Sequence, residues 1–491
     1  MKKNGFLSFL LLLVMIGYSQ SAMNISFPLI GKVQPRNASE IVSSNWIIGC
    51  ETLDRDYADY DQYKEYLNPL GIKRLRFQAG WAKTEKVKGQ YNWEWLDHIV
   101  NDATQRGLKP WLQFSYGNTI YEGGGGINLA AGVPHSAEAL AAWDKWVAAM
   151  VTRYKDKVQD WQIWNEPNFG NLEKFANTAE SSAALNIRTI DIVKKIQPEA
   201  RVSGLTMGHI DLNFAETFIK ILADSSRLKM FDNIVYHDYV YNPDSNYPKV
   251  MELRAILNKY APGLPLRQGE NGAPSGARLG GALGDHDWTE LSQAKWDTRR
   301  MLGDLGHDIE SSVFTIIDIA YDTDGPIKKL NVKGLIQSDS SKKAIRPKMA
   351  YYAVQHVASV FDNTLQRIEN VSELSGESTV SLKNTEHGYT KSTKTSLSVY
   401  AYKNKASGKQ VYTIWANGET PTNSTEKEHV DFTFTNGNFK KPVYVDIITG
   451  NVYEIPKSDW SKKGSTYRFK NIPVYDGPIL IADKSLILIK K

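Results

Sequence analysis

Residues 160–168 form the run Asp160-Trp161-Gln162-Ile163-Trp164-Asn165-Glu166-Pro167-Asn168, in which a carboxylate follows an apolar segment. Residues 158–164 are rich in apolar and aromatic side chains and have the length of a largely buried strand. Pro167 ends a sheet ladder because it has no backbone N–H to donate. We therefore expect Glu166 to lie where a strand gives way to a loop, which in a parallel barrel is the catalytic rim.

A second run of the same kind lies further along the chain, Leu264-Pro265-Leu266-Arg267-Gln268-Gly269-Glu270-Asn271-Gly272. It is also a short apolar strand that ends in a carboxylate before a turn. Two such carboxyl groups are what a glycosidase needs, because one protonates the leaving oxygen while the other attacks the sugar carbon or activates water. The alternative is that Glu166 and Glu270 are two unrelated surface glutamates.

The pattern around both runs repeats as a short apolar strand, a loop and an amphipathic helix. The expected strands are residues 46–50, 72–77, 108–114, 158–164, 200–205, 233–239, 264–269 and 312–320, and the expected helices are residues 57–67, 93–105, 136–154, 178–196, 213–222, 248–260, 289–305 and 346–361. Strands that alternate with helices imply right-handed parallel crossovers. Eight such units predict an α/β fold, a closed (β/α)8 TIM barrel over residues 45–363, with Glu166 ending its fourth strand and Glu270 its seventh.

From about residue 364 helical periodicity stops and short alternating segments appear. They are residues 396–402, 410–415, 430–434, 443–448, 452–455, 466–469 and 479–482. Turn signals separate them, including Asn417-Gly418, Asn436-Gly437 and Gly450-Asn451. This pattern predicts a C-terminal antiparallel β-sandwich over residues 364–491.

The N-terminal residues 1–22 have the pattern of a signal peptide, with two lysines, an apolar run and small residues at the expected cleavage region. The apolar run is too short for a comfortable membrane span, and no other run is long enough for one. Cys50 is the single cysteine, so no cysteine near the cleavage region supports lipid attachment. We expect a secreted or periplasmic protein. Residues 23–44 are polar and irregular, either a linker or a strand lent to another domain.

Composition limits the partners. The formal net charge is +5 with no dense Lys/Arg run, so we expect no nucleic-acid partner. The 13 Trp and 25 Tyr residues suit a protein that stacks sugar rings, or are simply core. The run Asp322-Thr323-Asp324-Gly325 lacks the later ligands of a calcium loop, and there is no His-x-x-x-His pair, so no metal or other cofactor is expected. The sequence says nothing of the oligomeric state.

The motif Trp164-Asn165-Glu166-Pro167-Asn168 resembles the acid/base motif of glycoside hydrolase clan A. Within the clan the chain is most similar to family 39, the β-xylosidase and α-L-iduronidase family. The resemblance covers the barrel, and the attached sandwich suits the clan. It implies a retaining hydrolase that cleaves a polysaccharide or oligosaccharide by double displacement. Glu166, which must carry a proton near neutral pH, would be the acid/base, and Glu270, which must stay ionised, the nucleophile.

The resemblance also implies roles for neighbouring side chains. Asn165 would bind the sugar 2-hydroxyl, His237 and Tyr239 at the end of the sixth strand would contact the nucleophile or the substrate, and Arg76 would hold the nucleophile ionised. Core or surface positions without such a role remain the alternatives for each. Further aromatic residues in or near the expected β→α loops are either stacking platforms for a sugar ring or core: Trp81, Trp111, Tyr116, Tyr121 and Trp288.

Two alternatives to this hypothesis stay open. One is an endo-acting glycanase of the same clan, which a long open aromatic cleft would favour over a blind pocket. The other is a non-catalytic carbohydrate-binding protein on a barrel scaffold, which fold alone does not exclude. Two intact carboxylates argue against the second. The glycine-rich run Tyr121-Glu122-Gly123-Gly124-Gly125-Gly126 is interpreted either as a lid over the cleft or as a plain loop.

Overall fold

The computed structural model describes residues 25–129, 132–169, 177–277, 281–321, 330–369, 379–386 and 389–491. The expected signal peptide, residues 1–22, and the run Asp322-Thr323-Asp324-Gly325 lie outside this set. Within it, none of the helices is both long enough and apolar enough to cross a membrane.

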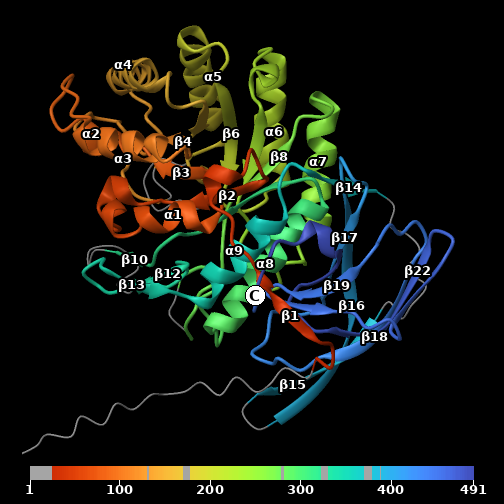
Figure 1. Cartoon of the computed structure of the whole chain (residues 1–491). Helices are drawn as coiled ribbons and strands as arrows, with labels where there is room; N and C mark the ends of the chain where they lie inside the picture. The colour runs from red at the N-terminus through yellow and green to blue at the C-terminus, as the bar shows by residue number, and fades with distance from the viewer. Residues whose placement is uncertain are drawn as a thin grey trace, which may run out of the picture.

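The predicted eight-stranded barrel is confirmed. Its parallel strands pair in chain order and the last pairs with the first, which closes the sheet (Figure 1). The strands are β2 (Trp46–Gly49), β3 (Arg74–Gln78), β4 (Lys109–Phe114), β5 (Asp160–Ile163), β6 (Arg201–Met207), β7 (Asn233–Tyr236), β8 (Leu266–Asn271) and β9 (Glu310–Val313). Glu166 therefore follows the fourth barrel strand, and Glu270 lies at the end of the seventh.

Helices follow the strands and surround the barrel (Figure 1). They are α1 (Lys64–Leu70), α2 (Trp81–Thr84), α3 (Glu94–Gln105), α4 (Ala137–Tyr154), α5 (Ala179–Ile196), α6 (Leu212–Asp224), α7 (Tyr247–Tyr260), α8 (Glu290–Gly306) and α9 (Met349–Val360). Several begin at a residue whose side-chain hydroxyl accepts a hydrogen bond from a backbone N–H of the first helical turn. Ser136 accepts from Ala139 N at the start of α4, Thr178 from Ser181 N at the start of α5, and Thr289 from Ser292 N at the start of α8.

Several expected boundaries were wrong, among them one near the start of the barrel and those of its last strand and last helix. The helix expected over residues 57–67 is a short 3₁₀ turn, Tyr60–Gln62, followed by α1. The eighth strand ends at Val313, because the Ile316 amide bonds Gly49 O and draws the chain back to the start of the barrel. The last helix begins at Met349, because Arg346 precedes Pro347, a position that disfavours helical geometry. Residues Ala344–Pro347 instead form strand β13, which pairs with β12 (Ile336–Ser338).

The C-terminal region forms two antiparallel sheets, as expected for a β-sandwich. One sheet has the order β14-β16-β17-β23-β19-β20-β1-β24 with β15 paired to β16, and the other has the order β18-β22-β21. The strands are β14 (Leu365–Ile368), β15 (Thr379–Glu386), β16 (Tyr389–Asn404), β17 (Gln410–Ala416), β18 (Glu428–Phe434), β19 (Pro442–Asp446), β20 (Asn451–Glu454), β21 (Trp460–Lys463), β22 (Thr466–Val474), β23 (Ile479–Asp483) and β24 (Ile489–Lys490). The long β15–β16 hairpin was not predicted.

The N-terminal segment contributes one strand to this sandwich. β1 (Leu29–Val33) pairs with β20 and β24, and Figure 1 shows it reaching from the barrel into the sheet. Within the described residues 25–44, the strand Leu29–Val33 therefore agrees with the alternative of a strand lent to another domain.

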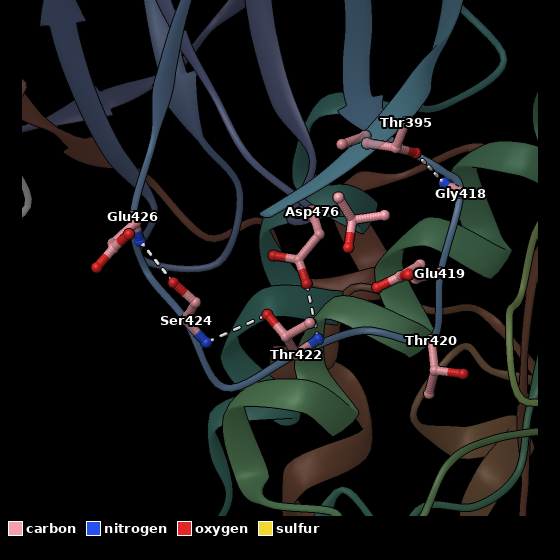
Figure 2. Close-up of a pocket in the computed structure, with 10 residues that line it drawn as sticks. Thr395, Gly418, Glu419, Thr420, Thr422, Ser424, Glu426 and Asp476 are labelled. Carbon is pink, nitrogen blue, oxygen red and sulfur yellow. Dashed lines mark hydrogen bonds between the residues drawn. The ribbon is translucent and has the colours of Figure 1, made fainter. Parts of the chain in front are cut away.

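Helix α8 supplies part of the barrel side of the domain contact. Lys295 is fully buried there and donates from Nζ to Asp476 Oδ1 at 2.6 Å and to the carbonyls of Thr422 and Ser424. Figure 2 shows the sandwich segment that supplies these carbonyls, with Asp476 also accepting from Thr422 N. A buried ammonium group is tolerated here because polar oxygens surround it.

At the end of the barrel away from Glu166 and Glu270, one carboxylate joins three strands. Glu310, the first residue of β9, pairs with Arg74 of β3 at 2.6 Å and with Arg267 of β8 at 2.5 Å. Burial alone raises the pKa of Glu310, but the two guanidinium groups outweigh it and lower the pKa to about 2. The ionised carboxylate of Glu310 therefore helps to hold strands β3, β8 and β9 together where the barrel closes.

Glu310 makes barrel stability depend on pH. The pKa of Glu310 is lower in the folded chain than in the unfolded chain. Its contribution to the free energy of unfolding is therefore fully present above about pH 4.5 and is lost as the pH falls to about 2. We expect Glu310→Gln to lower the free energy of unfolding by about 2 kcal/mol at pH 7, after a discount for partial exposure, and to match wild type near pH 2. Urea denaturation across this range measures the difference, and a gap independent of pH would contradict the assignment.

Candidate active site

Arg76 lies at the centre of the barrel mouth with no exposed surface. Its Nη1 donates to Glu51 Oε1 at 2.8 Å and to Glu270 Oε2 at 2.7 Å, its Nη2 to Asn165 Oδ1 at 2.7 Å and its Nε to Gln162 Oε1 at 3.0 Å. Because the guanidinium fork is planar and rigid, these bonds fix the positions of groups from different strands.

Glu270 is held as an anion. Besides Arg76, Tyr239 Oη donates to its Oε1 at 3.0 Å, and His237 Nδ1 lies 3.8 Å from its Oε2. Burial alone raises the pKa of Glu270, but His237, Arg76 and Tyr239 together lower the pKa below its ordinary value. Positive charge and hydrogen bonds to the ionised form are the physical cause.

Glu166 faces Glu270 with different partners. Its Oε1 lies 2.7 Å from His237 Nδ1, so one hydrogen is shared between the two groups. Oxygen atoms of Glu166 and Glu270 and a ring nitrogen of His237 lie within 4.8 Å of one another. The sequence-predicted residues Glu166, Glu270 and His237 therefore form one cluster, although Glu166 follows β5, His237 follows β7 and Glu270 lies in β8.

The backbone that presents Glu166 is unusual. Trp164 has φ 60° and Glu166 has φ 49°, in the left-handed region that non-glycine residues avoid. Surrounding bonds hold this geometry: Gln113 and Gln162 both donate to Trp164 O, and Glu166 N donates to Thr206 O. Departures of this kind persist where the surrounding structure over-determines them, and they cluster at functional sites.

Asn165 and Tyr116 also reach the cluster. Asn165 Nδ2 donates to Tyr116 Oη at 2.8 Å while its Oδ1 accepts from Arg76, so the amide orientation is set from both ends. Tyr116, another of the loop aromatics, is 2% exposed, so its hydroxyl is a buried partner of Asn165.

For three of the loop aromatics the structure favours the core alternative, because their rings are covered. Trp81 is stacked between Tyr121 and Trp146 and its indole N–H bonds Glu85. Trp111 lies inside the barrel with the guanidinium groups of Arg76 and Arg267 over its ring. Trp288 is 1% exposed and packs with Trp296, Ala273 and Leu283. Tyr121 donates to Glu85 and is also buried, at 6% exposed.

Backbone hydrogen bonds hold the glycine-rich run after β4 in one conformation. Gly117 N donates to Gly126 O and Asn118 N to Gly124 O. A side chain at Gly124 would meet Asn118 O at 2.1 Å, so the glycine is needed for close backbone approach. The described part of this run therefore does not support the lid hypothesis.

Two charged residues of the mouth were missed from sequence. Glu51 follows β2 and is 2% exposed, and burial raises its pKa to about 7, with Arg76 opposing. Lys333 is 3% exposed, with its Nζ 5.7 Å from the Tyr239 ring centre; burial lowers its pKa to about 8, while Glu270 and Asp297 act against the shift. Neither lies in a recognisable motif, since only the folded chain brings them to Glu270.

The cluster of Glu166, His237 and Glu270 offers three possible metal-ligand atoms. Their present bonds favour another interpretation: Arg76 already supplies positive charge to Glu270, and His237 Nδ1 is engaged with Glu166. A different hollow, in the sandwich, is lined by Thr395, Gly418, Glu419, Thr422, Ser424 and Asp476 (Figure 2). Its volume of about 30 Å³ is that of one water rather than a sugar ring.

Trp81 as a core residue gives a direct prediction. Trp81→Ala leaves a cavity among the neighbouring rings and should lower the free energy of unfolding by about 3–5 kcal/mol. Tyr352→Ala, at an exposed aromatic of α9, is the control and should change it by less than about 1 kcal/mol. Denaturant unfolding measures both; equal stability of the two variants would contradict the assignment.

Comparison with known proteins gives modest sequence similarity. No protein-family model matches the chain. A β-xylosidase from Geobacillus stearothermophilus is 23% identical over 194 residues, 35% of this chain and 38% of the relative. A 6-phospho-β-glucosidase from Clostridium longisporum is 24% identical over 119 residues, 22% of this chain and 24% of the relative. The matches therefore span well under half the length of these curated relatives.

Solved structures match over almost the whole chain. A family 39 glycoside hydrolase from Bacteroides cellulosilyticus WH2 has a TM-score of 0.60 at 18% identity, covering 92% of this chain and 83% of that one. A family 39 β-xylosidase from Caulobacter crescentus has a TM-score of 0.54 at 17% identity, with 93% and 98% covered. The catalytic domain of family 30 xylanase C from Talaromyces cellulolyticus has 0.55 at 11%, also with 93% and 98% covered. The chain thus has the fold of these glycoside hydrolases, which confirms the resemblance to clan A at the level of architecture.

Proposed function

We propose that this chain is a retaining glycoside hydrolase in which Glu166 is the acid/base and Glu270 the nucleophile. The observation that carries the proposal is the pair of carboxyl groups with oxygens within 4.8 Å of each other and unlike partners. Retaining enzymes keep their two carboxyl groups about 5–5.5 Å apart, whereas inverting enzymes leave room for a water at about 6.5–9.5 Å.

The two carboxyl groups suit two different tasks. In the first step Glu166 gives its proton to the glycosidic oxygen, the bond from that oxygen to the anomeric carbon breaks, and a Glu270 oxygen forms a bond to that carbon. In the second step Glu166 takes a proton from water, the water oxygen bonds the anomeric carbon, and Glu270 leaves as a carboxylate. Arg76 and Tyr239 favour the anion at Glu270 in both the starting and the final state.

A glycoside with a small glycone is the first substrate class to test. Similar proteins include β-xylosidases, which supports xylosides as a starting point. Burial of Trp81, Trp111 and Trp288 leaves fewer aromatic platforms in the described part of the barrel mouth, which counts against an endo-acting glycanase. A purely carbohydrate-binding protein has no need of an ion-paired Glu270 opposite a hydrogen-sharing Glu166.

We also propose export from the cytoplasm, supported by the composition of residues 1–22. N-terminal sequencing of the protein recovered from its native host measures this: a mature chain that begins after residue 22 supports export, and retention of Met1 contradicts it.

Removal of each carboxylate should give a different signature on aryl glycosides. Glu270→Ala should lower kcat by at least about 10⁴-fold, and azide should rescue it with an inverted glycosyl azide. In kcat/KM, Glu166→Ala should lose about 10²–10⁴-fold with poor leaving groups and little with good ones, because a good leaving group needs no proton in the first step. Its kcat should fall with both kinds of substrate, because Glu166 also takes the proton from water in the second step. Glu310→Gln, a carboxylate at the other end of the barrel, is the matched control and should keep turnover. Unchanged kcat in either site variant would remove that residue from the mechanism.

Tyr239 should set the acid limb of the pH profile of kcat/KM. Its hydroxyl donates to ionised Glu270, so Tyr239→Phe raises the pKa of Glu270 and moves the acid limb to higher pH by about one unit. Tyr321→Phe, whose hydroxyl accepts from Asn331 Nδ2 instead, should leave the limb in place. Steady-state kinetics from pH 4 to 8 measure both, and a limb that stays fixed in Tyr239→Phe would contradict the role of Tyr239.

A further inference from the structure

Arg76 has one positive charge but two carboxyl partners on the same nitrogen. Nη1 donates to Glu51 Oε1 at 2.8 Å and to Glu270 Oε2 at 2.7 Å. The Glu51 and Arg76 side chains are 1% and 0% exposed, so water screens neither. Two carboxylates this close would repel each other if both were ionised, and the usual outcome is that one of them keeps a proton.

The second oxygen of Glu51 shows where such a proton would sit. Glu51 Oε2 lies 3.1 Å from Thr315 Oγ1, and Thr315 Oγ1 lies 2.8 Å from Gly49 O. A hydroxyl has one hydrogen, and a carbonyl oxygen only accepts. If the threonine hydrogen points to Gly49 O, the shorter contact, then the bond between Glu51 and Thr315 needs a hydrogen on Glu51.

We propose that Glu51 is a positioning residue that carries the one proton of a Glu51–Glu270 carboxyl pair, so that Arg76 is balanced by a single negative charge and that charge stays on Glu270. The proton lies on Glu51 Oε2 and is donated to Thr315 Oγ1. Glu51 Oε1 still accepts from Arg76 and keeps the guanidinium group aimed at Glu270.

The electrostatics of the two carboxyl groups agree in direction. Burial raises the pKa of Glu51 to about 7, with Glu270 adding to the rise and Arg76 opposing it. The pKa of Glu270 is lowered despite its burial, chiefly by His237 and Arg76. The titratable and charged groups that face the pair from other elements, or flank it in the chain, are Cys50, Tyr63, Arg76, Tyr116, Glu166, His237, Tyr239, Tyr321 and Lys333.

An infrared titration of the full chain tests where the proton is. The infrared spectrum of Glu51→Gln is subtracted from that of wild type. The difference keeps the carboxylic acid C=O band of Glu51 and removes the bands of other buried carboxyl groups, such as Asp304, Asp318 and Asp297. We expect the difference to show one acid band at pH 5.5 that disappears with a midpoint near pH 7. No acid band in the difference at pH 5.5 would overturn the proposal.

Thr315→Val gives a second test that leaves the charge of Glu51 in place. If Glu51 donates to Thr315, loss of the acceptor destabilises the acid form and moves the midpoint of the band to lower pH. If Thr315 instead donates to an ionised Glu51, the same variant moves the midpoint to higher pH, which contradicts the proposal. Because the two hydrogen-bond directions move the midpoint in opposite directions, Thr315→Val decides between them even if Glu51→Gln does not fold.

The pH profile of kcat/KM provides the functional readout, and only this readout rests on the proposed function. With Glu51 already neutral in the acid range, Glu51→Gln should leave the midpoint of the acid limb unmoved, whatever its effect on the height of the profile. A shift to lower pH by about one unit would mean that a negative charge had been removed from beside Glu270. A wild type that cleaves no glycoside would end the proposed function, while the infrared titration would still decide the protonation of Glu51.

Discussion

The guanidinium group of Arg76 is the interaction on which the barrel mouth depends. It bonds side chains presented by strands β4, β5 and β8 or the loops that follow them, and also Glu51 beyond β2. Burying this charge without partners would be costly, so the positions of the carboxyl and amide groups around it are mutually enforced. The barrel brings the strand ends together, and the hydrogen bonds of Arg76 fix the positions of the side chains there.

His237 contacts the two carboxyl groups of the cluster at different distances. It shares a hydrogen with Glu166 and lies 3.8 Å from Glu270 Oε2, so it links a group suited to proton transfer with one suited to remain ionised. Left-handed backbone at Trp164 and Glu166 places the first carboxyl group, and Gly208 makes room for it, because a side chain there would approach Glu166 Cδ to 3.0 Å.

The sequence allowed the barrel, the sandwich and the central side chains to be predicted, because these leave local signals. Repeated strand–helix units, Pro167 after Glu166 and the turn dipeptides of the C-terminal region depend only on neighbouring residues. Exposure depends on the whole fold, which is why the sequence could not decide between a stacking platform and a core position for Trp81 and Trp111, both of which are buried. Glu51 was missed for the same reason: nothing beside it in sequence shows that Arg76 and Thr315 come to meet it.

Mechanism-based labelling tests the central claim most directly. A 2-deoxy-2-fluoro glycoside with an activated leaving group slows breakdown of a covalent intermediate more than its formation, so the intermediate accumulates and is identified by mass spectrometry of a protease digest. The account predicts one sugar per chain, attached to the peptide that contains Glu270. Attachment to another residue, or release of a product of inverted configuration with no labelled protein, would contradict it.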